Sequence, residues 1–176
     1  MPIQRALLIL DMQVGLFHGP EQPWQGERVL NNINRLIKTA HAAQAPIFAA
    51  RHTGPQGSPI EAGSALWQLL PTLVIDPQRD RLFDKTRPSA FYGTPLREWL
   101  QQAAVEEVVI AGMKTQYCVD TTCRIAAELG VRPVLVSDAH TCMDTPGLSA
   151  EAIVAHHNLT LAGAFATVCA TEAVQF

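Results

Sequence analysis

Two cysteines stand close together in residues 112–123, GMKTQYCVDTTC, near the expected start of a helix that follows an apolar strand. A thiol at a helix N-terminus lies at the positive end of the helix dipole, which lowers its pKa and makes thiolate available near neutral pH. Asp11 and Lys85 end two other expected strands. An aspartate can take the thiol proton and a lysine can stabilise the thiolate, so the combination predicts that Cys118 is a nucleophile.

Each of these residue types also has common structural roles. Taken singly, a helix-end cysteine is usually core filler, a strand-end aspartate a helix cap, and a lone lysine a surface residue. Four cysteines occur, without the CxxC spacing of zinc or thioredoxin-type sites: Cys118, Cys123, Cys142 and Cys169. On an α-helix Cys118 and Cys123 point about 140° apart, which excludes a disulfide between them. The prediction therefore rests on the combination, and we expect Cys123, Cys142 and Cys169 to be core filler.

Apolar runs alternate with amphipathic segments along the whole chain. The runs predict strands at 5–11, 46–51, 81–85, 107–112, 132–138 and 166–170. Helices are expected at 26–44, around 64–70, at 94–104 with Thr94 as N-cap, at 116–129, and at 149–163. Because the strands are continuously apolar and separated by helices, the fold class is α/β: a single-domain doubly wound parallel sheet, residues 1–176, with helices on both faces.

In such sheets ligands bind beyond the carboxyl ends of the strands. The residues at these ends include Asp11, His52, Lys85 and Cys118. The first turn after a strand, DMQVGLF, has one glycine instead of GxGxxG, and no GxxxxGK[ST] occurs. A dinucleotide or P-loop nucleotide site is therefore not expected.

The composition narrows the possible partners. The 176 residues are 48% hydrophobic and 16% charged, with a net charge of −3 and dispersed lysines and arginines. Nucleic-acid binding needs clustered basic residues, so it is not expected. No apolar run approaches the roughly 18 residues of a membrane helix, and the N-terminus enters a strand without a secretion signal. We expect a cytoplasmic protein with free thiols and a small-molecule substrate.

Five stretches resemble the isochorismatase-like cysteine hydrolases, the superfamily of nicotinamidase, N-carbamoylsarcosine amidohydrolase, ureidoacrylate hydrolase and isochorismatase. They are LLILDMQVGLF (7–17), FDKTRPSAFYGTPL (83–96), VVIAGMKTQYCVDTTCRIAAELG (108–130), VLVSDAHT (134–141) and the HHNLTLAGAFATV ending. The resemblance implies a triad of Asp11 as general acid/base, Lys85 as stabilising cation and Cys118 as nucleophile. It implies a cis Met113–Lys114 peptide and an oxyanion hole formed by the Lys114 and Cys118 amides.

The resemblance also implies a homo-oligomer whose neighbouring subunits can close the pocket, and a helix capped by Thr115. One departure concerns metals. Metal-binding nicotinamidases carry an Asp-x-His motif after the second strand, whereas this chain has ARHTGPQGSP there and no aspartate between Asp11 and Asp76. A single histidine cannot hold zinc or iron, so we expect no metal and no cofactor. His52 is left as a substrate contact or a polar loop residue.

The activity expected from these residues is hydrolysis of a small amide-like C–N bond through a Cys118 thioester. One alternative is isochorismatase-type vinyl-ether hydrolysis, which needs a proton donor but no nucleophile. Another is a non-catalytic binding or assembly module, since a fold alone does not prove activity. Two further positions are expected to be structural, Asp138 as a cap or turn residue and the pair His156–His157 as packing. The candidate substrate contacts are Phe17, His52, Trp67, Phe91, Tyr92 and Tyr117.

Overall fold

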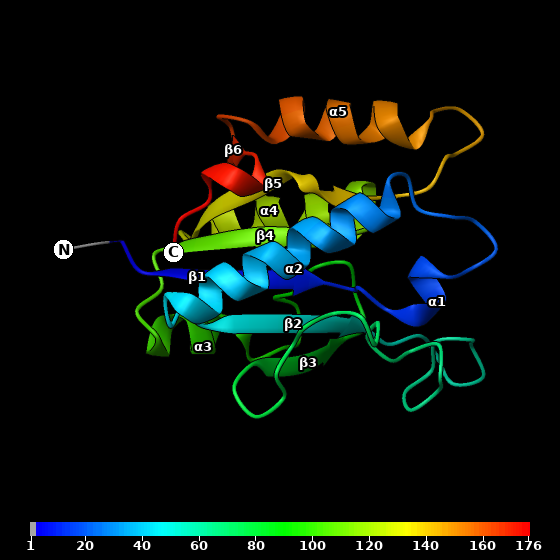
Figure 1. The fold of residues 1–176 in the computed structure, drawn as a ribbon, viewed down its shortest axis with the longest axis horizontal. Coiled ribbons are helices and arrows are strands. Elements are labelled where there is room, and N and C mark those ends of the chain that lie inside the picture. Colours follow the sequence, from blue (N-terminus) through cyan, green and yellow to red (C-terminus); the bar gives the residue numbers. More distant parts are fainter. Residues whose placement is uncertain (1–2) are drawn as a thin grey trace.

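A six-stranded parallel sheet forms the centre of the molecule, in a computed structural model that describes residues 3–176 (Figure 1). Its strand order is β3-β2-β1-β4-β5-β6. The strands are β1 (Arg5–Leu10), β2 (Ile47–His52), β3 (Arg81–Lys85), β4 (Glu107–Met113), β5 (Arg132–Thr141) and β6 (Thr167–Cys169). The predicted doubly wound parallel sheet is confirmed. Residues 1 and 2, which belong to the predicted domain and N-terminal stretch, lie outside the described residues.

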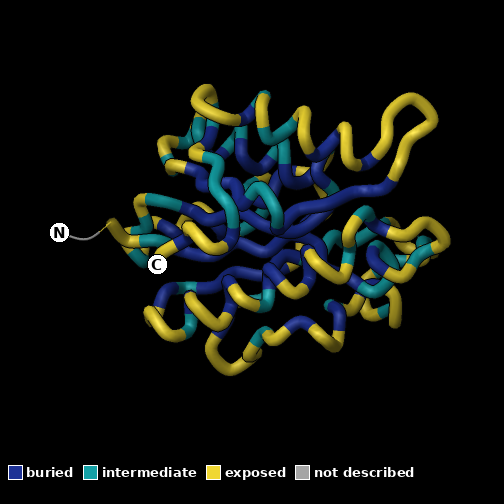
Figure 2. The backbone as a smooth tube through the Cα atoms, turned by 45° about the horizontal axis from the view of Figure 1, so that its top comes forward, coloured by how far each residue is buried: buried dark blue, intermediate teal, exposed yellow. Residues whose placement is uncertain are grey.

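Helices cover both faces of this sheet, which explains why its strands are apolar throughout. Helix α2 (Gly26–Ala42) crosses one face, and α3 (Leu96–Gln102) and α4 (Asp120–Glu128) cover the other (Figure 1). Alternate side chains of β1 point to opposite faces, so that Leu7 and Ile9 join the α2 core while Leu8 and Leu10 join the α3/α4 core. Helix α5 (Ala150–Leu161) lies beside β5. The buried backbone follows the strands and the exposed backbone follows the outer loops (Figure 2).

The segment before Cys118 folds differently from the expected α-helix over 116–129. A π-helical segment, η1 (Thr115–Val119), comes first, and α4 begins only at Asp120. Thr115 does not cap this segment, because Lys114 holds the N-cap position and the Thr115 hydroxyl instead hydrogen-bonds His140. Cys118 therefore lies in a wide π turn, a form that is often found at functional sites.

The helix expected around 64–70 is absent from the structure, and this prediction is wrong. The backbone there pairs with the turn after β1: Val14 N donates to Gln68 O at 2.9 Å and Gly15 N donates to Leu66 O at 2.8 Å. These carbonyls are no longer available for a helical hydrogen-bond ladder. The turn itself forms a short helix, α1 (Val14–Phe17), which the sequence did not predict, as it did not predict the 3-10 turn η2 (Thr171–Ala173).

Two element boundaries also differ from the predicted ones. Helix α3 begins one residue later than expected, with Pro95 at the N-cap position, but the Thr94 hydroxyl still accepts the expected capping hydrogen bond from Leu96 N at 3.4 Å while it donates to Ala90 O at 2.6 Å. Strand β5 continues to Thr141, because after a register shift His140 and Thr141 still pair with Gly112 and Met113 of β4. His140 is thereby carried to the end of the sheet where the chemistry is expected.

The neighbouring strands β1 and β4 form the switch point of the sheet, from which the strand order runs outward in both directions. The backbones are close here: Gly112 has φ +123°, and a Cβ at this position would collide with the backbone of Leu10. Asp11 leaves β1 with φ +53°, a left-handed conformation that is uncommon for residues other than glycine and that clusters at functional sites. Among the described residues, no helix is long and apolar enough to span a membrane.

Candidate active site

Asp11, Lys85 and Cys118 meet at the carboxyl edge of the sheet, although they come from three separate elements. Asp11 follows β1, Lys85 ends β3, and Cys118 lies in η1. The Lys85 side chain crosses the end of β2 to bring Nζ within 2.7 Å of Asp11 Oδ2 and 3.2 Å of Cys118 Sγ. Asp11 is fully buried, and Lys85 and Cys118 are 2% and 9% exposed. A buried ion pair with a thiol beside it is costly to form, which makes a purely structural role a poor explanation.

The Lys85 ammonium has more acceptors around it than it has protons. Besides Asp11 and Cys118, Nζ lies 3.3 Å from His52 Nδ1 and 3.2 Å from Arg87 O. An ammonium donates three hydrogen bonds and accepts none. Its three N–H groups are matched by His52 Nδ1, Arg87 O and Cys118 Sγ, while Asp11 is held by charge without an aligned hydrogen bond.

Burial, together with the Asp11 carboxylate and against the Lys85 charge, raises the pKa of the Cys118 thiol to about 12. The lowered pKa expected from the sequence is therefore wrong for the resting site. The reason is physical: the sulfur is shielded from water and faces a carboxylate as well as an ammonium. Cys118 rests as a thiol, and thiolate must form by proton transfer when the nucleophile is needed.

Asp11 is placed to receive that proton. Neither of its carboxylate oxygens has an aligned hydrogen bond within residues 3–176, although Oδ2 lies 2.7 Å from the Lys85 ammonium. The contact between Asp11 and Lys85 is therefore an ion pair that lacks the alignment of a hydrogen bond. Oδ1 in particular is a buried acceptor without a partner, a state that costs free energy unless a bound molecule or a transferred proton uses it.

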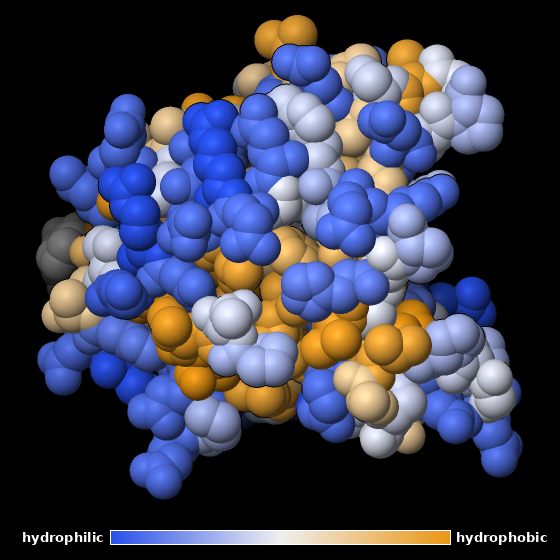
Figure 3. All heavy atoms as spheres, turned by 45° about the vertical axis from the view of Figure 1, so that its right-hand side comes forward, coloured by the Kyte–Doolittle hydropathy of each residue, from blue (hydrophilic) through white to orange (hydrophobic). Residues whose placement is uncertain are grey.

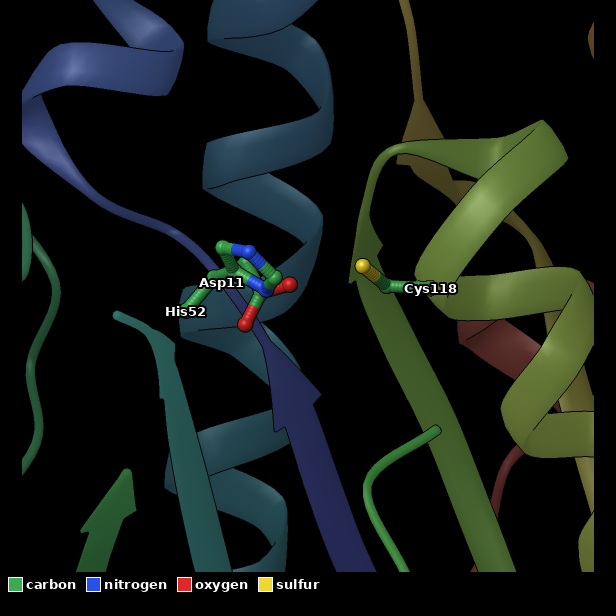
Figure 4. Close-up of side chains that lie close together, drawn as sticks. All are labelled: Asp11, His52 and Cys118. Carbon is green, nitrogen blue, oxygen red and sulfur yellow. The ribbon is translucent and has the colours of Figure 1, made fainter. Parts of the chain in front are cut away.

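His52 adjoins this group at the end of β2, where it is paired in register with Lys85. Burial and the Lys85 charge lower its pKa, while Asp11 raises it. Figure 4 shows the His52 ring beside the Asp11 carboxylate, with Cys118 facing both across a gap. His52 is therefore part of the site geometry and does not lie in a detached polar loop.

A cavity of about 220 Å³ opens onto these groups and is lined by Asp11, Leu16, His52, Pro88, Lys114, Tyr117 and Cys118. In the view of Figure 3, apolar residues gather in a patch below the middle of the face, and polar residues surround it. A larger cavity, about 400 Å³, is lined by Gly130, Arg132 and Phe165 among others, but no cysteine borders it. The smaller cavity is lined by both Asp11 and Cys118.

The six candidate substrate contacts are spread more widely than the sequence suggested. His52 and Tyr117 line the cavity, and Tyr117 is 54% exposed at its rim. The other four do not line it: Phe17 is in the core, Trp67 is buried under Arg51, Phe91 packs against the α3/α4 core, and Tyr92 is 67% exposed. Leu16 and Pro88 are cavity walls that were not among the predicted contacts, because only aromatic and histidine side chains were considered.

His140 supports the reactive turn, a role that the sequence did not predict. It is 1% exposed, its Nδ1 lies 2.9 Å from the Thr115 hydroxyl, and its Nε2 lies 2.9 Å from Asn158 Oδ1. The Asn158 amide nitrogen donates to Ser137 O at 3.1 Å, so Oδ1 is free to accept from Nε2–H. Nδ1 then accepts from Thr115, at the start of the turn that carries Cys118. The signal in the sequence was a histidine next to Thr141 in VLVSDAHT.

Burial lowers the pKa of His140 to about 4, and this makes stability depend on pH. Between about pH 6.5 and pH 4 the unfolded chain binds a proton that the folded protein excludes, so stability falls as the pH falls through this window. From this pKa we expect His140 to account for a loss of about 2 kcal/mol between pH 7 and pH 4.5. Urea unfolding at both pH values should show this loss, and His140→Gln should reduce it. An unchanged pH dependence in the variant would contradict the assignment.

Asp11, His52 and Cys118 also form a group of potential metal ligands, whose donor atoms lie within 4.8 Å of one another. The donor chemistry does not fit a resident ion, because the Lys85 ammonium already lies within 3.3 Å of all three side chains. A divalent ion placed among them would be repelled by this charge at contact distance.

We therefore expect activity to survive metal removal. Dialysis against a chelator, followed by elemental analysis and assay, should leave the rate within about two-fold of the untreated protein, because the cation role falls to Lys85. Loss of activity that zinc, iron or manganese restores would show that the expectation is mistaken.

The remaining candidates take structural positions. The Asp138 carboxylate accepts hydrogen bonds from the backbone and hydroxyl of Thr171 at 2.8 and 2.7 Å, so it caps η2, as a structural role predicts. Cys123 and Cys142 are fully buried, which confirms them as core residues, and Cys169 is partly buried. His156 is exposed, so packing is wrong for this member of the histidine pair, while the His157 ring donates to Ile153 O.

Comparison with known proteins gives the class to which this fold and site belong. The sequence matches the Isochorismatase domain over residues 5–173. A crystal structure of an isochorismatase family protein has 34% sequence identity and a TM-score of 0.88, over 94% of this chain and 98% of its own. The chain belongs to the isochorismatase family.

Relatives of known name have a sequence identity to this chain close to that of the crystal structure. A streptothricin hydrolase of Streptomyces noursei is 34% identical over 82% of this chain and 57% of its own length. A second streptothricin hydrolase of that organism is matched over 51% of its length, so this chain spans about half the length of these relatives. Nicotinamidase 3 of Arabidopsis thaliana is 31% identical over 76% of this chain and 71% of its own length.

Proposed function

We propose that this protein is a cysteine hydrolase that cleaves a small amide-like C–N bond through a thioester on Cys118. The observation that carries the proposal is the position of the Lys85 ammonium, 2.7 Å from Asp11 and 3.2 Å from Cys118 in a buried site that opens onto a small cavity. Acid/base, cation and nucleophile are then within contact of one substrate carbonyl. Family relatives named streptothricin hydrolase and nicotinamidase support hydrolysis as the reaction class.

In the first half of this reaction Asp11 takes the thiol proton as sulfur attacks the carbonyl carbon. A pKa near 12 for Cys118 means that little thiolate exists beforehand, so transfer to the unpartnered Asp11 oxygen accompanies the attack. As negative charge forms on sulfur, it is stabilised by the Lys85 N–H that already donates to Sγ. The new carbon–sulfur bond leaves a tetrahedral intermediate with a negatively charged oxygen.

We assign the stabilisation of that oxygen to the backbone amides of Lys114 and Cys118. Met113–Lys114 is a cis peptide in the structure, and Lys114 and Cys118 both line the cavity. Preorganised N–H donors of this kind are worth about 10²–10³ in rate per donor. The roles of Thr115 and His140 are then to hold the turn from which both amides project.

Collapse of the intermediate breaks the C–N bond, and Asp11 returns its proton to the departing nitrogen. Water then attacks the thioester, with Asp11 again accepting a proton, and the acid product leaves as the thiol is restored. Each proton taken in one step is given back in another, so no external oxidant, reductant or cofactor is required.

Two other functions remain as competitors. Vinyl-ether hydrolysis would use Asp11 as a proton donor and would leave Cys118 without a task. A non-catalytic module would have no use for a buried, costly Asp11–Lys85 pair beside a thiol. Both are therefore less well supported than amide hydrolysis. The homo-oligomer and the cytoplasmic location stay predictions.

A substrate panel tests the proposal. Primary amides, carbamoyl compounds and ureido compounds small enough for a cavity of about 220 Å³ are incubated with the protein, and ammonia release is measured. Cys169→Ala, which alters a thiol outside the site, is the matched control for Cys118→Ala. We expect release from at least one compound class with wild type and Cys169→Ala only; release that persists in Cys118→Ala would refute the mechanism.

A further inference from the structure

His52 is held at the cavity wall by a buried glutamine. The Gln13 side-chain oxygen accepts from His52 N at 2.7 Å, and its nitrogen donates to His52 O at 3.0 Å and to Trp67 O at 2.8 Å. Gln13 is fully buried, so these three bonds fix the end of β2 against the turn after β1. They hold the His52 backbone in place, and the Lys85 contact with Nδ1 orients the ring.

The neighbouring ammonium determines which ring nitrogen carries the proton. Lys85 Nζ lies 3.3 Å from His52 Nδ1 and can only donate, so Nδ1 must be the acceptor. A second proton on the ring is disfavoured, because burial and the Lys85 charge lower the pKa of His52. His52 is then a neutral imidazole with its hydrogen on Nε2.

Among the described residues, that hydrogen takes part in no hydrogen bond. Within residues 3–176, the hydrogen bonds of His52 use only its backbone and Nδ1. Nε2 is also not among the atoms sealed away from solvent, and the residue lines the cavity (Figure 4). The cavity walls at Leu16 and Pro88 have no side-chain hydrogen-bonding groups. Asp11 also borders the cavity but forms no hydrogen bond with His52 Nε2, which leaves this donor open to a bound molecule.

We propose that His52 Nε2–H donates to a second hydrogen-bond acceptor of the substrate, next to the scissile amide, and so selects for substrates that carry one. The acceptor is neutral, a ring nitrogen or a second carbonyl, because the Asp11 carboxylate and the Lys85 ammonium beside His52 are paired with each other and leave no net charge to hold an ion. This inference rests on the proposed function and names the substrate class for it: small amides with a nearby neutral acceptor.

Aromatic aldehydes test the contact without knowledge of the natural substrate. An aldehyde adds to a thiol by forming a carbon–sulfur bond while the thiol proton moves to the carbonyl oxygen, which gives a thiohemiacetal. Benzaldehyde and the 2-, 3- and 4-pyridinecarbaldehydes have nearly the same shape, but the pyridines place one acceptor at three successive ring positions. The adduct is detected by NMR of the 13C-labelled aldehyde carbon, and its dissociation constant is measured.

The variants His52→Phe and His52→Gln isolate the hydrogen bond. Phenylalanine keeps a planar ring without a donor, and the glutamine amide can accept from Lys85 while donating onward. For each variant, the affinity for a pyridine isomer is divided by the affinity for benzaldehyde. For at least one isomer this ratio should fall about three- to ten-fold in His52→Phe, as expected for the loss of one neutral hydrogen bond, and should recover in His52→Gln. Comparison of ratios cancels the different reactivities of the aldehydes. Ratios equal in wild type and His52→Phe for all isomers would overturn the inference.

A second readout separates this inference from the proposed function. 15N NMR of histidine in the unliganded protein reports the tautomer, and we expect hydrogen on Nε2 of His52 and none on Nδ1. Hydrogen on Nδ1, or an imidazolium at pH 7, would overturn the inference whatever the aldehydes do. If no aldehyde adds to Cys118, the proposed nucleophile fails, and the tautomer still decides the assignment of His52.

Discussion

Replacing Cys118 with alanine should lower kcat/KM for an active amide by about four to six decades, the loss typical when a catalytic nucleophile is removed. The amide nitrogen is a poor leaving group, and the bond cannot break without attack by sulfur or by an equally activated water. The cavity and the Asp11–Lys85 pair would remain, so substrate should still bind. Steady-state kinetics with Cys118→Ala and with the control Cys169→Ala give the comparison.

The same variant separates amide hydrolysis from vinyl-ether hydrolysis. A vinyl ether is cleaved after protonation, which requires Asp11 and not the thiol. A Cys118→Ala protein that keeps more than about a tenth of the wild-type rate would rule out the cysteine mechanism.

Asp11→Asn should cost about three to four decades in kcat/KM and should also destabilise the fold. The asparagine amide has a similar size but cannot take the thiol proton or return it to the leaving nitrogen. Lys85, which is 2% exposed, would lose its counter-charge, and breaking a buried ion pair from one side typically costs about 3–5 kcal/mol. Kinetics and urea unfolding on the same preparation measure both effects.

Asp84→Asn is the matched control for this variant. Asp84 pairs with Arg51 at 2.8 Å, but its side chain is 46% exposed, and surface pairs contribute about 0–1 kcal/mol. We expect it to change neither quantity appreciably. If Asp11→Asn were as mild as Asp84→Asn, Asp11 would be neither the proton carrier nor the partner of a charged Lys85.

The sequence predicted the fold class, and it predicted that Asp11, Lys85 and Cys118 would lie at one edge of the sheet. Both predictions depend on local signals in the sequence. Continuous apolar runs such as ALLIL require a strand that is covered on both faces, and a polar residue that follows such a strand lies at the ligand-binding edge. Asp11 and Lys85 were identifiable on these grounds. The contact between Lys85 and Asp11 follows from the strand order. Because β3, β2 and β1 are neighbours, the Lys85 side chain can reach past the end of β2 to Asp11.

Features that depend on tertiary contacts were not predictable in this way. The helix expected at 64–70 was lost because carbonyls such as Leu66 O are used by the turn after β1. The pKa of Cys118 was misjudged because a helix N-terminus was considered, whereas burial and a facing carboxylate dominate. His140 was missed because its task depends on β5 extending past a register shift, and no local pattern in VLVSDAHT marks that shift.

The most direct test of the mechanism is the mass of the protein during turnover. Wild type is mixed with an excess of an active amide, quenched in acid within the turnover time, and analysed by intact mass and peptide mapping, beside a Cys118→Ala sample. A gain equal to the acyl part of the substrate, located on the peptide that contains Cys118 and absent from the variant, is the predicted result. If turnover proceeds while quenched samples never carry an acyl group and Cys118→Ala keeps its rate, no thioester lies on the path and the central claim is contradicted.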